Sequence, residues 1–277
     1  MIVRFMLFIL VIAFASPALA AQKPVIAVSI VPQATFARAV CGDLVDIVTM
    51  IPPGASPSNY EPAPELIAKF SKAALYFSIG VPTEKNNILP ALAANTRLVP
   101  LAEKVSAVYP DARIGQGRDP HIWLSPKRAV VLVQAIADAM SDFDPANKVH
   151  YQNNAAAFIA QVQAADAHIK AALAPVQNKQ FMVFHPAFGY IAADYGLTMY
   201  ALEDHGKEAT AKHLQDMVAL AKKEGIKVIF YQAEIDSRQS QAFAEEIGGV
   251  TMRLEPLSAE YIANLERMAE TIAKAMH

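Results

Sequence analysis

The stretch from position 147 to position 176 reads NKVHYQNNAAAFIAQVQAADAHIKAALAPV and predicts a single long helix. It holds no glycine and no proline before Pro175, and alanine, the best helix former, recurs throughout. Its apolar residues follow the spacing of one helix face: Phe158, Val162, Ala165, Ile169 and Leu173. Because a helix bends far less than a glycine- and serine-rich linker, the segments on its two sides are expected to stay at a nearly fixed separation.

Short apolar, β-branched runs alternate with helix-like segments on both sides of this stretch. The runs are 24–31, 45–51, 75–79 and 97–101 before it, and 181–184, 197–202, 228–232 and 251–254 after it. Strands separated by helices predict parallel sheets built from β-α-β crossovers. The predicted fold is therefore α/β with two lobes, each a small parallel sheet flanked by helices, joined by one long rigid linker helix. The expected bounds are 21–146 for the N-terminal lobe, 147–176 for the linker helix and 177–277 for the C-terminal lobe.

The first twenty residues have the pattern of a secretory signal peptide. Arg4 precedes an uninterrupted apolar run over 5–15, and small residues follow up to Ala18-Leu19-Ala20. This run is shorter than a membrane span and ends in a cleavage pattern, so a membrane anchor is the less favoured interpretation. Residues 1–20 are expected to be a signal peptide cleaved near Ala20, and the mature chain is expected in the periplasm.

Composition excludes some classes of partner. The formal net charge of −2 gives no reason to expect binding to nucleic acid or to an anionic membrane surface. Cys41 is the single cysteine, so no disulfide forms within the chain, and no cysteine follows the signal to carry a lipid. The expectation is an exported soluble protein, acting as a monomer.

Polar loops follow several of the predicted strands. They are PPGASPSNYEP after 45–51, His185-Pro186 after 181–184, Ala233-Glu234 after 228–232 and Glu255-Pro256 after 251–254. The carboxyl ends of parallel strands meet at one edge of a sheet, so these loops can converge there, and the segment DPHIWLSP over 119–126 joins them. Imidazoles and a carboxylate brought together suit a divalent transition metal, and they also suit acid-base chemistry.

Five segments, in order along the chain, resemble the zinc and manganese solute-binding proteins of ABC importers, a family of periplasmic metal-binding proteins. The segments are PPGASPSNYEPAPE, DPHIWLSP, FHPAFGYIAADYGL, EDHGKEATAKHL and RLEPLSAEY. The resemblance implies a metal held in the cleft between two lobes and delivered to a membrane permease. The expected cargo is a divalent ion, zinc before manganese or iron.

Carried over residue by residue, the resemblance implies that His121 and His185 are metal ligands. Glu255 stands where the family has an aspartate, and Glu234 is the less favoured carboxylate. Ser58 occupies the position of the family's first histidine ligand, and a neutral hydroxyl is a poor donor to zinc. Asn59, water or His205 could complete the shell. The predicted ligand set is His121, His185, Glu255 and Asn59.

Two alternatives remain open at this stage. Because Ser58 replaces an imidazole, the same scaffold could carry a different cargo, such as iron, manganese or a metal chelate, or the protein could be a metallochaperone. A secreted metal-dependent hydrolase is the other alternative, since three protein ligands plus water make a catalytic zinc site. The sequence holds neither H-E-x-x-H nor G-x-S-x-G, so the prediction is a binding protein and not an enzyme.

Overall fold

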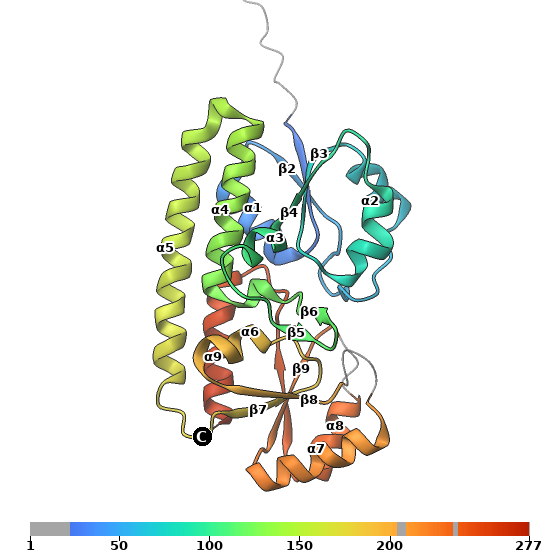
Figure 1. Cartoon of the computed structure of the whole chain (residues 1–277), viewed down its shortest axis with the longest axis vertical. Coiled ribbons are helices and arrows are strands. Elements are labelled where there is room, and N and C mark those ends of the chain that lie inside the picture. The colour runs from blue at the N-terminus through green and yellow to red at the C-terminus, as the bar shows by residue number, and fades with distance from the viewer. Residues whose placement is uncertain (1–22, 204–208, 235–237, 277) are drawn as a thin grey trace, which may run out of the picture.

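The computed structural model describes residues 23–203, 209–234 and 238–276 and contains two parallel sheets. The first has the order β2-β1-β3-β4, and the second has the order β10-β9-β7-β8. The first sheet consists of β2 (Asp46–Thr49), β1 (Val25–Val28), β3 (Ala73–Ser78) and β4 (Arg97–Pro100). The second consists of β10 (Val250–Leu254), β9 (Val228–Gln232), β7 (Gln180–Val183) and β8 (Thr198–Ala201). Each of the eight predicted strands is confirmed, and Figure 1 shows the two sheets one above the other.

Helices flank both sheets. They are α1 (Val31–Cys41), α2 (Pro64–Phe70), α3 (Leu101–Ser106), α4 (Pro126–Phe143), α5 (Lys148–Leu173), α6 (Gly189–Tyr195), α7 (Ala211–Glu224), α8 (Arg238–Glu246) and α9 (Tyr261–Ala275). A short antiparallel hairpin of β5 (Arg113–Ile114) and β6 (Gly117–Arg118) lies between the two halves. No helix in the described part of the chain is long and apolar enough to cross a membrane.

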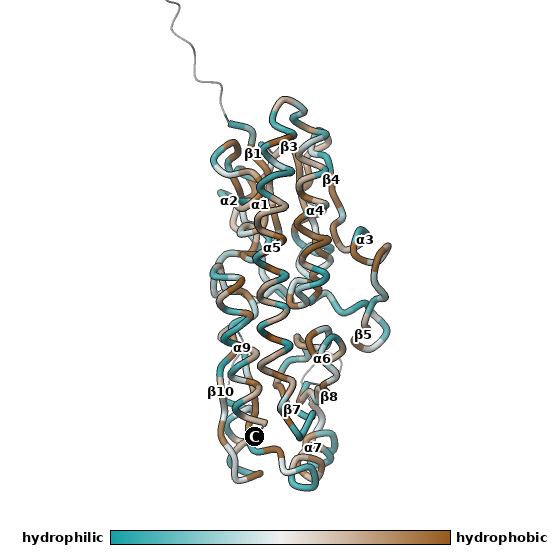
Figure 2. The backbone as a smooth tube through the Cα atoms, turned by 90° about the vertical axis from the view of Figure 1, so that its left-hand side faces the viewer, coloured by the Kyte–Doolittle hydropathy of each residue, from teal (hydrophilic) through white to brown (hydrophobic). Residues whose placement is uncertain are grey.

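The long helix α5 runs beside both halves of the molecule. Its 26 residues span about 39 Å, and it packs on α1 and α4 at one end and on α9 at the other. Figure 2 shows this helix in front of both halves. The predicted face is buried at Val162, Ala165, Ile169 and Leu173, while Phe158 is half-buried. The prediction of two lobes joined by a long helix is confirmed, and the domain bounds stay a prediction.

Contacts from the C-terminal segment tie the second half to the first. The Tyr261 hydroxyl donates to the Trp123 carbonyl oxygen at 2.6 Å, and the Trp123 indole N–H donates to the Pro256 carbonyl oxygen at 2.8 Å. The Tyr261 ring also meets the Phe36 ring edge-on, with centroids 4.6 Å apart. These buried aromatic contacts join the two halves. The predicted signal peptide, residues 1–20, lies outside the described residues.

Candidate metal site

His121 lies between the hairpin and α4, on a segment that its neighbours hold firmly. Its backbone N–H and its Nδ1 both approach Asp119 Oδ1, at 2.9 and 2.7 Å. Ser125 caps the next helix by accepting from the Arg128 backbone N–H, and Pro126 occupies the first turn, where its missing N–H does no harm. The DPHIWLSP segment is therefore held on both sides of His121, by Asp119 before it and by the Ser125 cap after it.

His185 follows β7 and belongs to the other half of the molecule. Its Nδ1 lies 2.6 Å from Glu203 Oε2, and Glu203 follows the neighbouring strand β8. Since β7 and β8 are parallel neighbours, their carboxyl ends deliver the imidazole and the carboxylate to the same place. Both side chains are largely buried, with 13% and 14% of their surface exposed.

The two imidazoles face each other through their Nε2 atoms, which are 3.4 Å apart. Their ring planes make an angle of 78°, with centroids 5.2 Å apart. A carboxylate only accepts hydrogen bonds, so Asp119 and Glu203 hold the proton of each neutral ring on Nδ1 and leave both Nε2 lone pairs facing each other. Two Zn–N bonds of about 2.05 Å at the tetrahedral angle place their nitrogens about 3.3 Å apart, so the spacing fits one shared ion.

Burial keeps the His121 ring in the neutral form that binds metals. Desolvation lowers the pKa of the imidazole, and the hydrogen bond and charge of Asp119 oppose that shift. His185 lowers the pKa further, since two adjacent cations repel each other. A neutral, oriented imidazole is the form in which histidine donates to a transition metal.

A cavity of about 340 Å³ opens at this histidine pair. Its polar lining comes from both halves of the chain: Ser56, Ser58, Arg118, His121, His185, Gln232 and Glu234. Trp123 also lines it. Ser58 therefore faces the cavity, as its place in the motif predicts.

The structure does not bring the other predicted ligands to the pair. The Glu255 carboxylate pairs with Arg253, and the Glu255 side chain, 44% exposed, is absent from the cavity lining. Asn59 is exposed and also lies outside the lining, while His205 lies outside the described residues. Within those residues, no group of three or more His, Cys, Asp and Glu side chains is arranged to hold a metal ion. The assembled part of the site is the pair of imidazoles.

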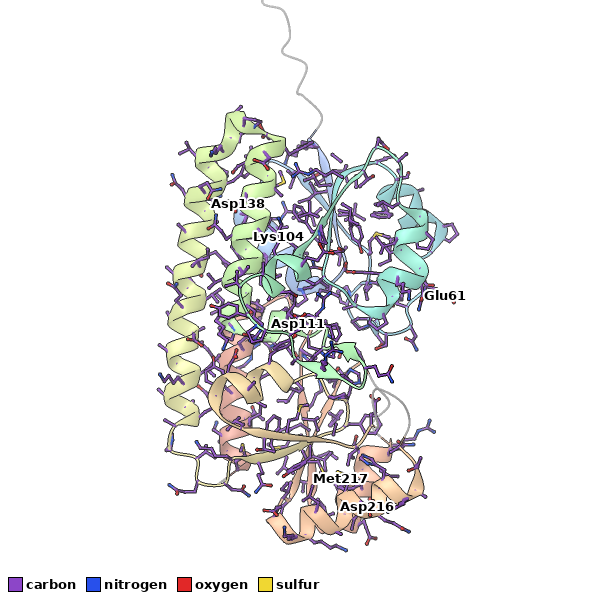
Figure 3. All side chains as sticks on the ribbon, in the orientation of Figure 1. Glu61, Lys104, Asp111, Asp138, Asp216 and Met217 are labelled. Carbon is purple, nitrogen blue, oxygen red and sulfur yellow. The ribbon has the colours of Figure 1, made fainter. Side chains whose placement is uncertain are left out.

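The carboxylates that orient the imidazoles are residues that sequence reasoning missed. Glu61, the carboxylate nearest to Ser58 in the chain, is exposed and lies at the outer side of the first half (Figure 3). The signal for Asp119 was its place two residues before His121, where an aspartate can turn back onto the backbone. The signal for Glu203 was its position directly after a strand, as for the ligand candidates themselves.

Two sheets joined by a long helix, with a polar cavity where they meet, define the chain as a two-lobed solute-binding protein. The chain belongs to the family described as zinc-uptake complex component A, periplasmic, or ZnuA, whose model matches residues 26–275. This family is a family of transport proteins that bind a solute.

Similar proteins include the zinc-binding lipoprotein AdcA of Streptococcus pneumoniae, 30% identical over 244 residues, covering 82% of this chain and 49% of that protein. The high-affinity zinc uptake system protein ZnuA of Bacillus subtilis is 28% identical over 242 residues, covering 82% of this chain and 76% of that one. This chain thus spans about half the length of its streptococcal relatives.

Solved structures agree in fold. The structure described as the crystal structure of ZnuA superposes with a TM-score of 0.86 at 32% identity, covering 92% of this chain and 100% of the other. The periplasmic zinc-binding protein TroA of Treponema pallidum superposes with a TM-score of 0.85 at 19% identity, covering 92% and 99%, and shares the fold.

Proposed function

We propose that this chain captures a divalent transition metal ion, zinc first, in the cleft between its lobes and delivers it to the membrane permease of an ABC importer. The observation that carries the proposal is the pair of Nε2 atoms 3.4 Å apart, each held from behind by a carboxylate. The names of the similar proteins, zinc-binding and zinc-uptake proteins, support the same cargo.

The ligand set favours zinc over harder ions. Two imidazole nitrogens suit zinc, whereas manganese is better served by oxygen ligands. His121 and His185 are the ligands already in place, and Glu255 and Asn59 would have to leave their present surroundings to reach the ion. In our proposal, the ion is held by the two imidazoles, and further donors complete the shell.

The proposal is for binding and release without turnover, by a periplasmic monomer cleaved near Ala20. The formal net charge of −2 supports the absence of nucleic acid from its partners. The family description as a periplasmic component of an uptake complex supports the compartment and the permease. Hydrolysis of ester or peptide substrates by the zinc-loaded protein, lost on His185→Ala, would contradict the absence of turnover.

Metal analysis of protein isolated without added ions tests the proposal. About one divalent ion per chain is expected, and His121→Ala and His185→Ala should each lose it. His168→Ala is the matched control, because His168 is a half-exposed imidazole on α5 that pairs with Glu270, away from the cavity. An equal metal content in all four proteins would refute the site, and no metal together with no stabilisation by added zinc would refute the function.

A further inference from the structure

The cavity at the histidine pair is much larger than a bare ion needs. Its volume is about 340 Å³, whereas one water molecule occupies about 30 Å³ of liquid. A metal ion with ligands about 2 Å away fills a small part of that space. The cavity has room for a small organic molecule beside the metal.

Two buried polar atoms of this cavity have no hydrogen-bond partner among the described residues. Gln232 ends β9 and is 7% exposed, and its Nε2 is unpaired. Glu234 follows two residues later, and its Oε2 is buried and also unpaired. Both residues line the cavity with His121 and His185.

An unpaired buried donor and an unpaired buried acceptor in residues that line the same cavity indicate the chemistry of a ligand. The Gln232 amide needs a group that accepts a hydrogen bond, such as a carboxylate oxygen, and Glu234 Oε2 needs a group that donates one. Leaving either group unsatisfied costs stability, so a molecule that satisfies both gains affinity. A ligand with a carboxylate and an amine close together meets both requirements.

The wall of the cavity adds a positive charge for the carboxylate. Arg118 lines the cavity, is half-buried and donates to the Ser106 hydroxyl at 3.3 Å. Burial raises the pKa of the Glu84 carboxyl, and the positive charge of the Arg118 guanidinium is close enough to that group to oppose the rise. An anion in the cavity would meet the same charge.

The metal itself leaves room for such a ligand. Zinc is usually four-coordinate, and the structure supplies two imidazoles in position to coordinate. An α-amino acid chelates through its amine nitrogen and one carboxylate oxygen, which supplies the remaining two donors. Its amine keeps N–H groups that can donate to Glu234, and its carboxylate can accept from Gln232 and Arg118.

We propose that the cargo is a metal ion bound together with a small α-amino-acid chelator, whose carboxylate and amine are recognised by Gln232, Arg118 and Glu234. This inference rests on the proposed metal-binding function and names the substrate of the same site. Ser58 fits it as well, because a hydroxyl in place of a third imidazole keeps a coordination position open for the chelator.

Equilibrium dialysis with radiolabelled L-histidine at a fixed free zinc concentration tests the proposal on the full chain. About one labelled histidine per chain is expected with zinc, and less than a tenth of that without zinc. Gln232→Leu and Glu234→Gln should each weaken histidine retention by roughly 10- to 100-fold relative to the parent. The control Gln163→Leu, an exposed position on α5, should retain both.

Thermal unfolding of the zinc-free variants separates recognition from structural damage. Gln232→Leu removes a buried donor without a partner, so its unfolding temperature should equal or exceed that of the parent. If Gln232→Leu fails to fold, Glu234→Gln serves for the same comparison with almost no change of side-chain shape.

A competition experiment tests the need for an amine. Citrate, which has carboxylates and no amine, should not replace histidine.

The outcomes separate the two proposals. Zinc bound without any retained histidine would overturn the chelator and leave the proposed function standing. Histidine retained equally by the parent, Gln232→Leu and Glu234→Gln would overturn its placement. If neither zinc nor histidine is retained, the proposed function itself fails.

Discussion

Asp119→Asn tests whether a buried carboxylate sets the affinity of the histidine pair. The Asp119 side chain is 2% exposed and accepts from His121 Nδ1 at 2.7 Å and from the His121 backbone at 2.9 Å. Asparagine keeps an acceptor oxygen and a nearly identical volume, so the loop should keep its shape. The substitution removes the negative charge behind the ring.

The size of the effect follows from the distance between that charge and the ion. The ion beyond Nε2 lies about 7 Å from the carboxylate, where a unit charge and a divalent cation interact by about 1 kcal/mol in water and about 5 kcal/mol at an effective dielectric constant of 20. Loss of such a partner typically weakens metal binding 10- to 100-fold, or about 1.4 to 2.7 kcal/mol. We expect a loss of zinc affinity in that range.

Competition against a zinc-selective fluorescent chelator, repeated over a pH series, measures this effect. Asp119 raises the pKa of His121, but its charge acts about twice as strongly on a divalent ion as on a proton, so its removal should weaken zinc binding at neutral pH and raise the pH at which protons displace the metal. Asp138→Asn, an exposed position on α4 (labelled in Figure 3) that is absent from the cavity lining, should leave both quantities unchanged. Unchanged zinc affinity in Asp119→Asn would refute the role of the charge.

Three further changes test other parts of the chain. Ser58→His should tighten zinc binding by about tenfold or more by adding a nitrogen donor at the cavity; titration showing no gain would mean that position 58 does not reach the metal. Burial raises the pKa of Glu84 above its ordinary 4.5, so the folded chain holds that proton more tightly than the unfolded chain. As the pH rises from 4.5 towards the raised pKa, the free energy of unfolding of the parent should therefore fall relative to that of Glu84→Gln, by about 1.4 kcal/mol per pH unit. Denaturant titrations over this pH range measure the difference, and parallel pH profiles for the two proteins would count against it. Burial raises the pKa of the Cys41 thiol to about 12, so thiol reagents should label it only after unfolding, and fast labelling of the folded chain would contradict its burial.

Local patterns in the sequence were sufficient for the fold. Each strand could be predicted because it is a short apolar run between turn residues, and α5 because one face repeats along its length. His185 could be placed at the edge of the sheet because it follows a strand, whereas His121 was selected through the resemblance of the DPHIWLSP segment to the family motif. Those signals depend on backbone geometry, which neighbouring residues largely set.

Side-chain directions could not be predicted in this way. Glu255 follows β10 as His185 follows β7, yet its carboxylate pairs with Arg253 and lies outside the cavity. Glu234, the less favoured carboxylate at the sequence level, lines the cavity with a buried unpaired oxygen. Which of two neighbouring carboxylates faces the cavity depends on the competing charges around it.

The sequence by itself determined two parallel α/β lobes joined by a long helix, and which two histidines stand at strand and helix ends. Only the tertiary structure decided that their Nε2 atoms lie 3.4 Å apart, because that distance depends on how α5 and α9 hold the two sheets against each other. It also decided which carboxylate stands behind each ring and which polar atoms stay unpaired in the cavity. Such contacts join residues far apart in the chain, so local sequence carries no record of them.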